Sequence, residues 1–367
     1  MLRYWIGFNK VPGIGAKKLR ALLDVCGDIE AAWQATLAQM AEAGLDRRSA
    51  TNLAQLRREL DLEAELNRVQ RAGLEVLTWD DPRYPSLLKR IDAPPPVLFM
   101  SGSLNSADDW AVAVVGTRRA TAYGRECALR LSTDLAQAGV TIVSGLARGI
   151  DAIAHEAAIA ARGRTLAVLG NGLDSIYPPE HRQLANRIVG HGALLTEQPL
   201  GMKPEARNFP ARNRIISGLS LAVVIVEGDW KSGAVITAKQ ALEQGREVFA
   251  VPGSILSPSS EGPNRLIKDG ATPILSANDL LEALNLSKVA QQSAARQVLP
   301  SDPIEARLYG LLSAEPRHVD ELRRAAELPI SDVTSTLALM ELKGLVRQVG
   351  GMQYVVAREP GMVYRID

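Results

Sequence analysis

The chain has 367 residues, a length that predicts two or three domains, and 42 Lys and Arg against 41 Asp and Glu give it a formal net charge of +1. Hydrophobic residues at 46% and charged residues at 23% are ordinary for globular proteins and exclude wholesale disorder. Two cysteines are too few for a disulfide framework, and the sequence shows neither a signal-peptide core nor a run of about 18 apolar residues, so we expect a cytoplasmic protein without a membrane span.

Residues 1–75 have the pattern of an α-helical domain. Apolar residues recur every three or four positions, and Gly27, Gly44 and Gly73 stand where helices are expected to end. The segment VPGIGAKKL places a Gly-x-Gly turn ahead of two lysines, as in a helix-hairpin-helix contact with DNA phosphates. Residues 1–80 carry 11 basic and 11 acidic residues, so a structural or partner-binding role is as well supported as weak DNA binding.

Residues 76–285 are expected to form a Rossmann-like domain. Its N-terminal extension, residues 76–110, holds five of the 20 prolines, which favours extended chain with short strands. From residue 111 onward, short apolar runs such as WAVAVVG and REVFAVPG alternate with amphipathic helical stretches. Apolar runs of this kind are strands buried on both faces, so the pattern predicts a doubly wound, mainly parallel α/β sheet.

Residues 286–302 are polar, unpatterned and rich in Ala, Gln and Ser, which predicts a linker. Residues 303–367 then show three helical stretches and a two-stranded hairpin turning at Gly350-Gly351, the pattern of a winged helix. The would-be recognition helix has one basic residue, Lys343, and it comes late. Base readout uses polar and basic residues in the first turns, so we expect protein contact or weak non-specific DNA contact from this domain.

The strand-to-helix junctions of the predicted sheet combine small residues with Arg, Lys or amide side chains. The carboxyl ends of the strands form the ligand-binding edge of such a sheet, where helix N-termini offer free N–H groups. Residues 111–275 carry 18 basic against 14 acidic residues, an excess of four that the near-neutral total conceals. The junctions together predict a phosphate-binding edge, with the candidates Gly116, Thr117, Arg118, Ser144, Gly145, Arg148, Asn171, Phe209, Arg212, Asn213, Lys231 and Ser232.

These junctions lie in long blocks that resemble the signature blocks of the DprA/Smf family of bacterial DNA-processing proteins, among them VAVVGTRRATAYG, VSGLARGIDAIAHEAA, TLAVLGNGLDSIYPPEH and NFPARNRIISGLS. The resemblance runs without a gap from about Tyr84 to Ala271. The flanking units are similar to that family's accessory domains, an N-terminal SAM-like or helix-hairpin-helix unit and a C-terminal winged helix. One departure is Gly228, where the family usually has Ala after the Glu.

The resemblance implies a non-enzymatic recombination mediator that binds and protects incoming single-stranded DNA and loads RecA on it during natural transformation or DNA repair. It also implies a homodimer formed through the Rossmann-like domain, displacement of single-strand-binding protein, and at most weak binding of double-stranded DNA. It assigns phosphate contact to Arg118 and base stacking to Phe209, with Arg207, Arg212 and Asn213 nearby. The alternative for Phe209 is a plug at the base of its helix.

Other chemistry finds little support in the sequence. No GxxxxGK[ST] motif occurs and GNGLDS lacks the third glycine of GxGxxG, so neither a P-loop nor an NAD site is predicted. The four histidines are scattered without metal-ligand spacing, and we expect no cofactor and no metal site. The alternative function is a nucleotide- or phosphosugar-hydrolysing enzyme of the lysine-decarboxylase-like Rossmann type. Such an enzyme carries a PGGxGT loop followed by Glu, whereas this chain has VPGSILSPSSEG, so a protein without catalytic residues is favoured.

Overall fold

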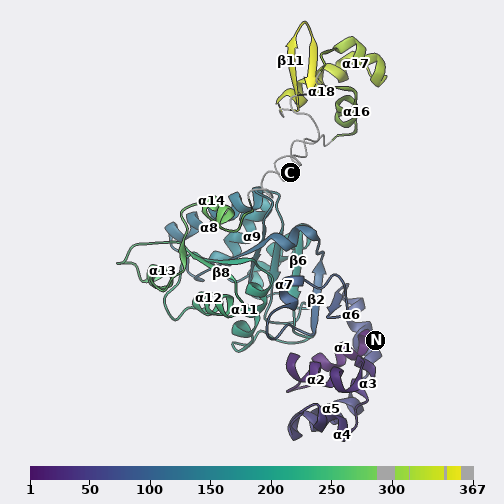
Figure 1. Cartoon of the computed structure of the whole chain (residues 1–367), viewed down its shortest axis with the longest axis vertical. Helices are drawn as coiled ribbons and strands as arrows, with labels where there is room; N and C mark the ends of the chain where they lie inside the picture. The colour runs from purple at the N-terminus through teal and green to yellow at the C-terminus, as the bar shows by residue number, and fades with distance from the viewer. Residues whose placement is uncertain (287–301, 314, 343–344, 357–367) are drawn as a thin grey trace, which may run out of the picture. The chain divides into compact units, whose positions relative to one another are not determined.

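A computed structural model describes residues 1–286, 302–313, 315–342 and 345–356. The chain divides into two compact units, residues 1–290 and 291–367 (Figure 1). The predicted helical domain and the predicted Rossmann-like domain both belong to the first unit, so the boundary between them stays a prediction. The predicted linker falls almost wholly outside the described residues.

The chain begins with six helices, as the apolar spacing predicted. Asp28, Thr36, Asp46 and Asp61 cap four of them by accepting hydrogen bonds from backbone N–H groups of the first turn. The glycines expected to end helices, at positions 27, 44 and 73, all adopt positive φ angles that favour glycine. The helices are α1 (Leu2–Asn9), α2 (Ala16–Cys26), α3 (Ile29–Trp33), α4 (Leu37–Glu42), α5 (Arg47–Glu59) and α6 (Leu62–Arg71).

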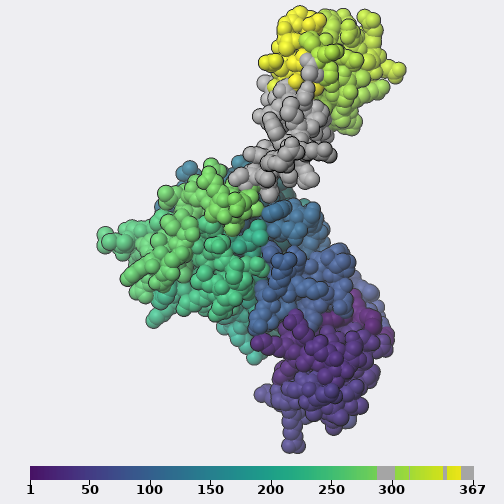
Figure 2. Space-filling model, in the orientation of Figure 1, coloured from purple at the N-terminus to yellow at the C-terminus, as the bar shows by residue number. Residues whose placement is uncertain are grey.

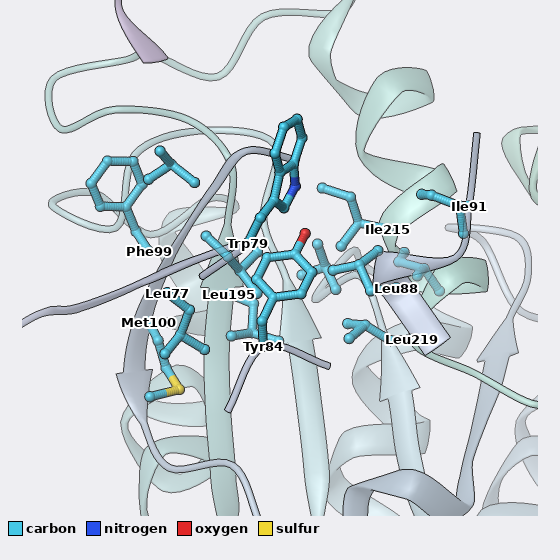
Figure 3. Close-up of a cluster of buried hydrophobic side chains, with 14 of the residues drawn as sticks. Leu77, Trp79, Tyr84, Leu88, Ile91, Phe99, Met100, Leu195, Ile215 and Leu219 are labelled. Carbon is cyan, nitrogen blue, oxygen red and sulfur yellow. The ribbon is translucent and has the colours of Figure 1, made fainter. Parts of the chain in front are cut away.

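Aromatic side chains join these helices to the sheet that follows. The rings of Trp5 and Trp79 meet edge to face with their centroids 5.7 Å apart, and Asn9 donates a hydrogen bond to the carbonyl oxygen of Glu197. In the space-filling view the purple N-terminal helices accordingly lie against the blue residues of the first strands (Figure 2). The proline-rich extension packs into the same core, where Trp79, Tyr84 and Leu88 lie among side chains of the sheet (Figure 3).

The sheet has nine strands within the described residues, in the order β1-β2-β6-β5-β4-β3-β7-β8-β9. In this order, the seven neighbouring strands β6-β5-β4-β3-β7-β8-β9 all pair parallel. At one edge of the sheet, β1 and β2 pair antiparallel with each other, and β2 pairs antiparallel with β6. The predicted doubly wound, mainly parallel sheet is therefore confirmed. The strands are β1 (Glu75–Thr78), β2 (Val97–Gly102), β3 (Ala111–Val115), β4 (Thr141–Ser144), β5 (Thr165–Val168), β6 (Gly192–Thr196), β7 (Ala222–Ile225), β8 (Glu247–Ala250) and β9 (Thr272–Pro273).

Helices cover both faces of the sheet because alternate residues of each strand point to opposite faces. On β3, Val112 and Val114 pack in one core with α8, α9 and α14, whereas Ala113 and Val115 belong to another with α11, α12 and α13. The helices are α7 (Ser86–Lys89), α8 (Ala122–Gln137), α9 (Ile150–Ala160), α10 (Arg182–His191), α11 (Asn208–Gly218), α12 (Gly233–Glu243), α13 (Glu261–Lys268) and α14 (Ala277–Ala283). Over the described residues, no helix combines the length and apolar character that crossing a bilayer requires.

The second unit is a winged helix with a core of its own. Leu308, Leu322 and Leu337, from its three helices, are fully buried together with residues of the hairpin. The hairpin turns at the predicted glycines, both with positive φ. Lys343 lies outside the described residues. The elements are α16 (Pro303–Leu311), β10 (Arg317–His318), α17 (Val319–Ala326), α18 (Ile330–Leu342), β11 (Val346–Gly350) and β12 (Gln353–Val356).

Candidate nucleic-acid interface

A cleft of about 620 Å³ opens at the carboxyl ends of β3 and β7. After β3 the chain continues to β4 on one side, and the later strand β7 joins on the other, so the connections leave in opposite directions at this point. Such a switch point is where doubly wound sheets bind ligands. The predicted candidates among the lining residues are Gly116, Thr117, Arg118, Phe209, Arg212, Asn213 and Ser232.

The loop after β3 is held by close backbone contacts. The amide of Thr117 donates a hydrogen bond to the carbonyl oxygen of Glu227 over 2.7 Å. Gly149 has a φ of +76° and approaches the same loop so closely that a Cβ there would lie 2.3 Å from the Thr117 oxygen. A glycine is therefore required at position 149. The side chains of Arg118 and Arg119 follow this fixed turn and are exposed at the cleft.

The carboxylate of Glu227 is buried behind the same loop. It accepts hydrogen bonds from the amide of Thr121 over 3.0 Å and from the Thr121 hydroxyl over 2.5 Å, and a weaker one from Ser259. Glu227 therefore anchors the start of α8. At the adjacent Gly228, an alanine Cβ would lie 2.5 Å from the Ser232 hydroxyl oxygen, so the departure from the family pattern changes how Ser232 packs.

Three side chains, two from loops and one from the start of α11, meet between this cleft and a small neighbouring one. The guanidinium carbon of Arg118 lies 5.5 Å from the centroid of the Phe209 ring, and the ring of Tyr177 lies 5.8 Å from Phe209 at a tilt of 46°. All three line both clefts. The smaller cleft is also bordered by Gly145 and Arg148, two of the predicted residues. Cationic and aromatic groups at one edge are what a single strand requires, for its phosphates and its bases respectively.

Arg212 lines the cleft, but its guanidinium is not available to a phosphate. It is buried, and it donates hydrogen bonds to the carbonyl oxygens of Gly145, over 2.6 Å, and of Val168. Burial lowers the pKa of Arg212 to about 10, and the nearby carboxylate of Asp151 opposes that shift. The prediction of a DNA contact at Arg212 is corrected to a structural role, in which the guanidinium ties together the ends of β4 and β5.

Two further candidates point into the protein. The Ser144 hydroxyl is buried and donates to the carbonyl oxygen of Val114 over 2.7 Å. Asn171 is also buried, and its amide nitrogen donates to the carbonyl oxygens of Gly172, over 3.0 Å, and of Ser175, over 2.6 Å. Their predicted DNA contacts are corrected as well, because side chains used in this way shape the loops after β4 and β5.

The remaining candidates lie at the margins. Asn213 is 8% exposed and donates to the carbonyl oxygen of Gly233 over 3.3 Å. Arg148 and Arg207 are exposed and paired with nearby acids, Arg148 with Glu180 at 2.5 Å and Arg207 with Glu205 at 2.7 Å. Lys231 is exposed on the turn before α12. Neither Arg207 nor Lys231 lines the two clefts, so the structure does not bring them into the central group.

Two residues that line the larger cleft, Tyr177 and Arg119, were not among the predicted contacts. Both stand in blocks that were singled out, Tyr177 in GLDSIYPP and Arg119 beside Arg118. The scarcity of aromatic residues, 4% of the chain, was the signal that could have drawn attention to a tyrosine in a junction loop. Over the described part of the chain, no group of three or more His, Cys, Asp or Glu side chains is placed to hold a metal ion.

Comparison with known proteins decides the family. The model of the family described as DNA recombination-mediator protein A matches residues 75–285, and the model of the DprA winged helix domain matches residues 292–352. The chain belongs to the DprA family of DNA recombination mediators. The predicted resemblance and the predicted winged helix are thereby confirmed.

Relatives of this DprA-family chain span most of its length. Protein Smf of Synechocystis sp. is 38% identical over 388 residues, covering 96% of this chain and 98% of the relative. DNA processing protein DprA of Bacillus subtilis is 48% identical over 213 residues, which cover 58% of this chain and 72% of the relative.

Two solved structures of DNA processing protein A are similar in fold. That from Streptococcus pneumoniae superposes with a TM-score of 0.69 at 34% identity, covering 77% of this chain and 98% of that one. That from Helicobacter pylori superposes with a TM-score of 0.52 at 30% identity, covering 58% and 97%. The Helicobacter structure is described as giving insight into a unique single-stranded DNA binding mode.

Proposed function

We propose that this protein is a non-enzymatic recombination mediator that binds single-stranded DNA at the β3–β7 cleft and loads RecA on the bound strand. The observation that carries the proposal is the exposed Arg118 guanidinium set against the Phe209 ring at the carboxyl edge of the sheet. The single-stranded DNA binding described for the Helicobacter relative supports the same ligand here.

The composition of the cleft favours a single strand over a duplex. Aromatic rings stack on unpaired bases, which a duplex keeps inside its own stack. Arg118 and Arg119 supply positive charge for phosphates at the same place, and no readout of a particular base is required. We therefore expect sequence-tolerant binding, with double-stranded DNA bound more weakly.

The acidic groups of the cleft argue for binding rather than catalysis. Among its lining residues, all of them described, Asp151 is the single carboxylate. It is buried, and it accepts hydrogen bonds from the amides of Gly145 at 3.1 Å and Ala147 at 3.4 Å. A hydrolase requires a base that can reach a water molecule, and this carboxylate is engaged with the backbone instead.

The proposal extends to partners by family resemblance. RecA is the expected recipient of the strand, single-strand-binding protein is the competitor that is displaced, and a homodimer through the Rossmann-like domain is the expected assembly. The cytoplasm is the expected compartment, since it is where RecA acts on incoming DNA.

The test uses the full chain with a labelled oligo-dT strand and with a duplex of equal length. We expect the single strand to bind at least about tenfold more tightly, which corresponds to 1.4 kcal/mol, and both DNAs to be recovered intact. In a second assay, the protein should accelerate RecA filament formation on strands coated with single-strand-binding protein. Equal affinity for the two DNAs, or cleaved or dephosphorylated DNA after incubation, would contradict the proposal.

A further inference from the structure

Tyr177 offers the more exposed aromatic ring of the pair that separates the two clefts. Tyr177 is 37% exposed as a whole residue, whereas Phe209 is half-buried. We infer that Tyr177 is the ring on which a nucleobase stacks, and that Phe209 mainly supports it. This inference rests on the proposed function, because it concerns how a single strand would be held at that site.

Four neighbours cover part of the Phe209 ring. Arg118 and Arg212 place their guanidinium carbons 5.5 and 5.9 Å from its centroid. One ring edge faces the backbone of Gly170, where an added Cβ would come within 3.3 Å of the Phe209 Cδ1 atom. Tyr177 covers a further part. A ring enclosed by four neighbours contributes mainly by holding them in place.

The loop that carries Tyr177 is held in position, while Tyr177 itself stays exposed. It belongs to the loop after β5, which the buried amide of Asn171 fixes through its hydrogen bonds to Gly172 and Ser175. On the other side of Tyr177, His181 binds the carbonyl oxygen of Leu146 through Nδ1 at 2.8 Å. A ring on a fixed loop loses little conformational entropy when a base stacks on it, which favours binding.

The position of Tyr177 between the clefts defines what it would do. A strand passing from the larger cleft to the smaller would cross the line of Arg118, Phe209 and Tyr177. Arg118 would meet a phosphate there and Tyr177 the adjacent base. This arrangement predicts that a ring at position 177 contributes to affinity only when the strand carries bases.

The experiment compares Tyr177→Ala and Tyr177→Phe in the full chain, using oligo-dT and a strand of equal length that consists mostly of abasic sites. On oligo-dT, Tyr177→Ala should weaken binding by about 5- to 150-fold, the effect of removing one stacking platform. Tyr177→Phe keeps the ring and should bind within about twofold of the parent. On the abasic strand, the difference between Tyr177→Ala and the parent should largely disappear.

A matched control is Tyr123→Ala, which removes a tyrosine that is 50% exposed on α8 and lines neither cleft. It should bind oligo-dT like the parent. The inference is overturned if Tyr177→Ala binds oligo-dT like the parent, or if it loses as much affinity on the abasic strand, since the role would then be structural. Failure of the parent to bind single strands would instead overturn the proposed function, and the inference with it.

Discussion

Arg118 and Phe209 face each other across the cleft, with the guanidinium carbon 5.5 Å from the ring centroid. The two residues come from the loop after β3 and the start of α11, so their contact joins the two sides of the switch point. A cation over an aromatic ring is stabilised by the ring's quadrupole and keeps its polar N–H groups free at the edges. The contact with Phe209 therefore holds the Arg118 guanidinium at the edge of the cleft.

Replacing Arg118 by Ala should reduce single-strand affinity by about tenfold or more, because it removes both a phosphate contact and the ring partner. Arg118→Lys keeps the charge but loses the planar fork, and its affinity should fall between those of the parent and Arg118→Ala. The control is Arg187→Ala on α10, which lines neither cleft. Fluorescence anisotropy with oligo-dT measures all four proteins, and a loss under about twofold for Arg118→Ala would place the site elsewhere.

Salt should weaken the binding of single strands steeply. Arg118, Arg119 and Arg148 are exposed at the two clefts, and each phosphate neutralised on a single strand contributes about −0.7 to the slope of log K against log salt concentration. Three phosphate contacts predict a slope of about −2 for log K against log salt concentration, and Arg118→Ala should reduce the magnitude of that slope by about 0.7. Titrations at several salt concentrations measure the slope. A slope close to zero would mean that phosphate contacts contribute little to the binding of the single strand.

The sheet could be predicted because its strands are buried on both faces and read as continuous apolar runs. The run Val112 to Val115, rich in β-branched residues and followed by Gly116, is typical of such a strand. The antiparallel pairing of β1 with β2 at the edge of the same sheet could not be predicted, because it depends on tertiary packing of Trp79 and Tyr84 in a proline-rich segment.

The site was predictable at the level of loops and less so at the level of side chains. Position in a junction places a residue at the sheet edge, but whether its side chain turns outward depends on which backbone groups remain unpaired. Arg212 and Asn171 turn inward because carbonyl oxygens of neighbouring loops require donors. The sequence pattern contains no sign of that requirement.

Removing the winged helix should leave most single-strand binding intact. The unit formed by residues 291–367 has its own buried core, and the cleft is lined entirely by residues of the first unit. A chain ending at Leu286 should bind oligo-dT within about threefold of the full chain, a difference below 1 kcal/mol. Anisotropy measures the affinity, and circular dichroism verifies folding. Loss of binding in a folded truncated chain would show that the winged helix supplies contacts.

Replacing Arg212 by Met should destabilise the fold. The substitution removes the donor to the carbonyl oxygens of Gly145 and Val168, and leaving a buried polar group unsatisfied costs about 1–3 kcal/mol. Arg207→Met, at an exposed residue, should change the free energy of unfolding by less than about 0.5 kcal/mol. Urea titrations measure both variants. Equal stability of the two would show that Arg212 does not tie the loops together.

His155 should make the fold less stable as pH falls. It is fully buried on α9, with Nδ1 2.6 Å from the Thr165 hydroxyl oxygen, which itself donates to the carbonyl oxygen of Ile142. Nδ1 therefore carries the proton of a neutral ring. Burial lowers the pKa of His155 to about 3 from an ordinary value of 6.5.

At a pH between these two pKa values, His155 is protonated in the unfolded chain but neutral in the folded chain. The free energy of unfolding should therefore fall as pH drops below about 6.5, by up to about 1.4 kcal/mol per pH unit from this residue. His155→Asn keeps a donor toward Thr165 but does not titrate, so it should lower stability at neutral pH and flatten the decline below it. Urea titrations between about pH 7.5 and pH 4.5 measure the slope for the parent and for His155→Asn. If His155→Asn declines as steeply as the parent, the acid sensitivity arises from other groups.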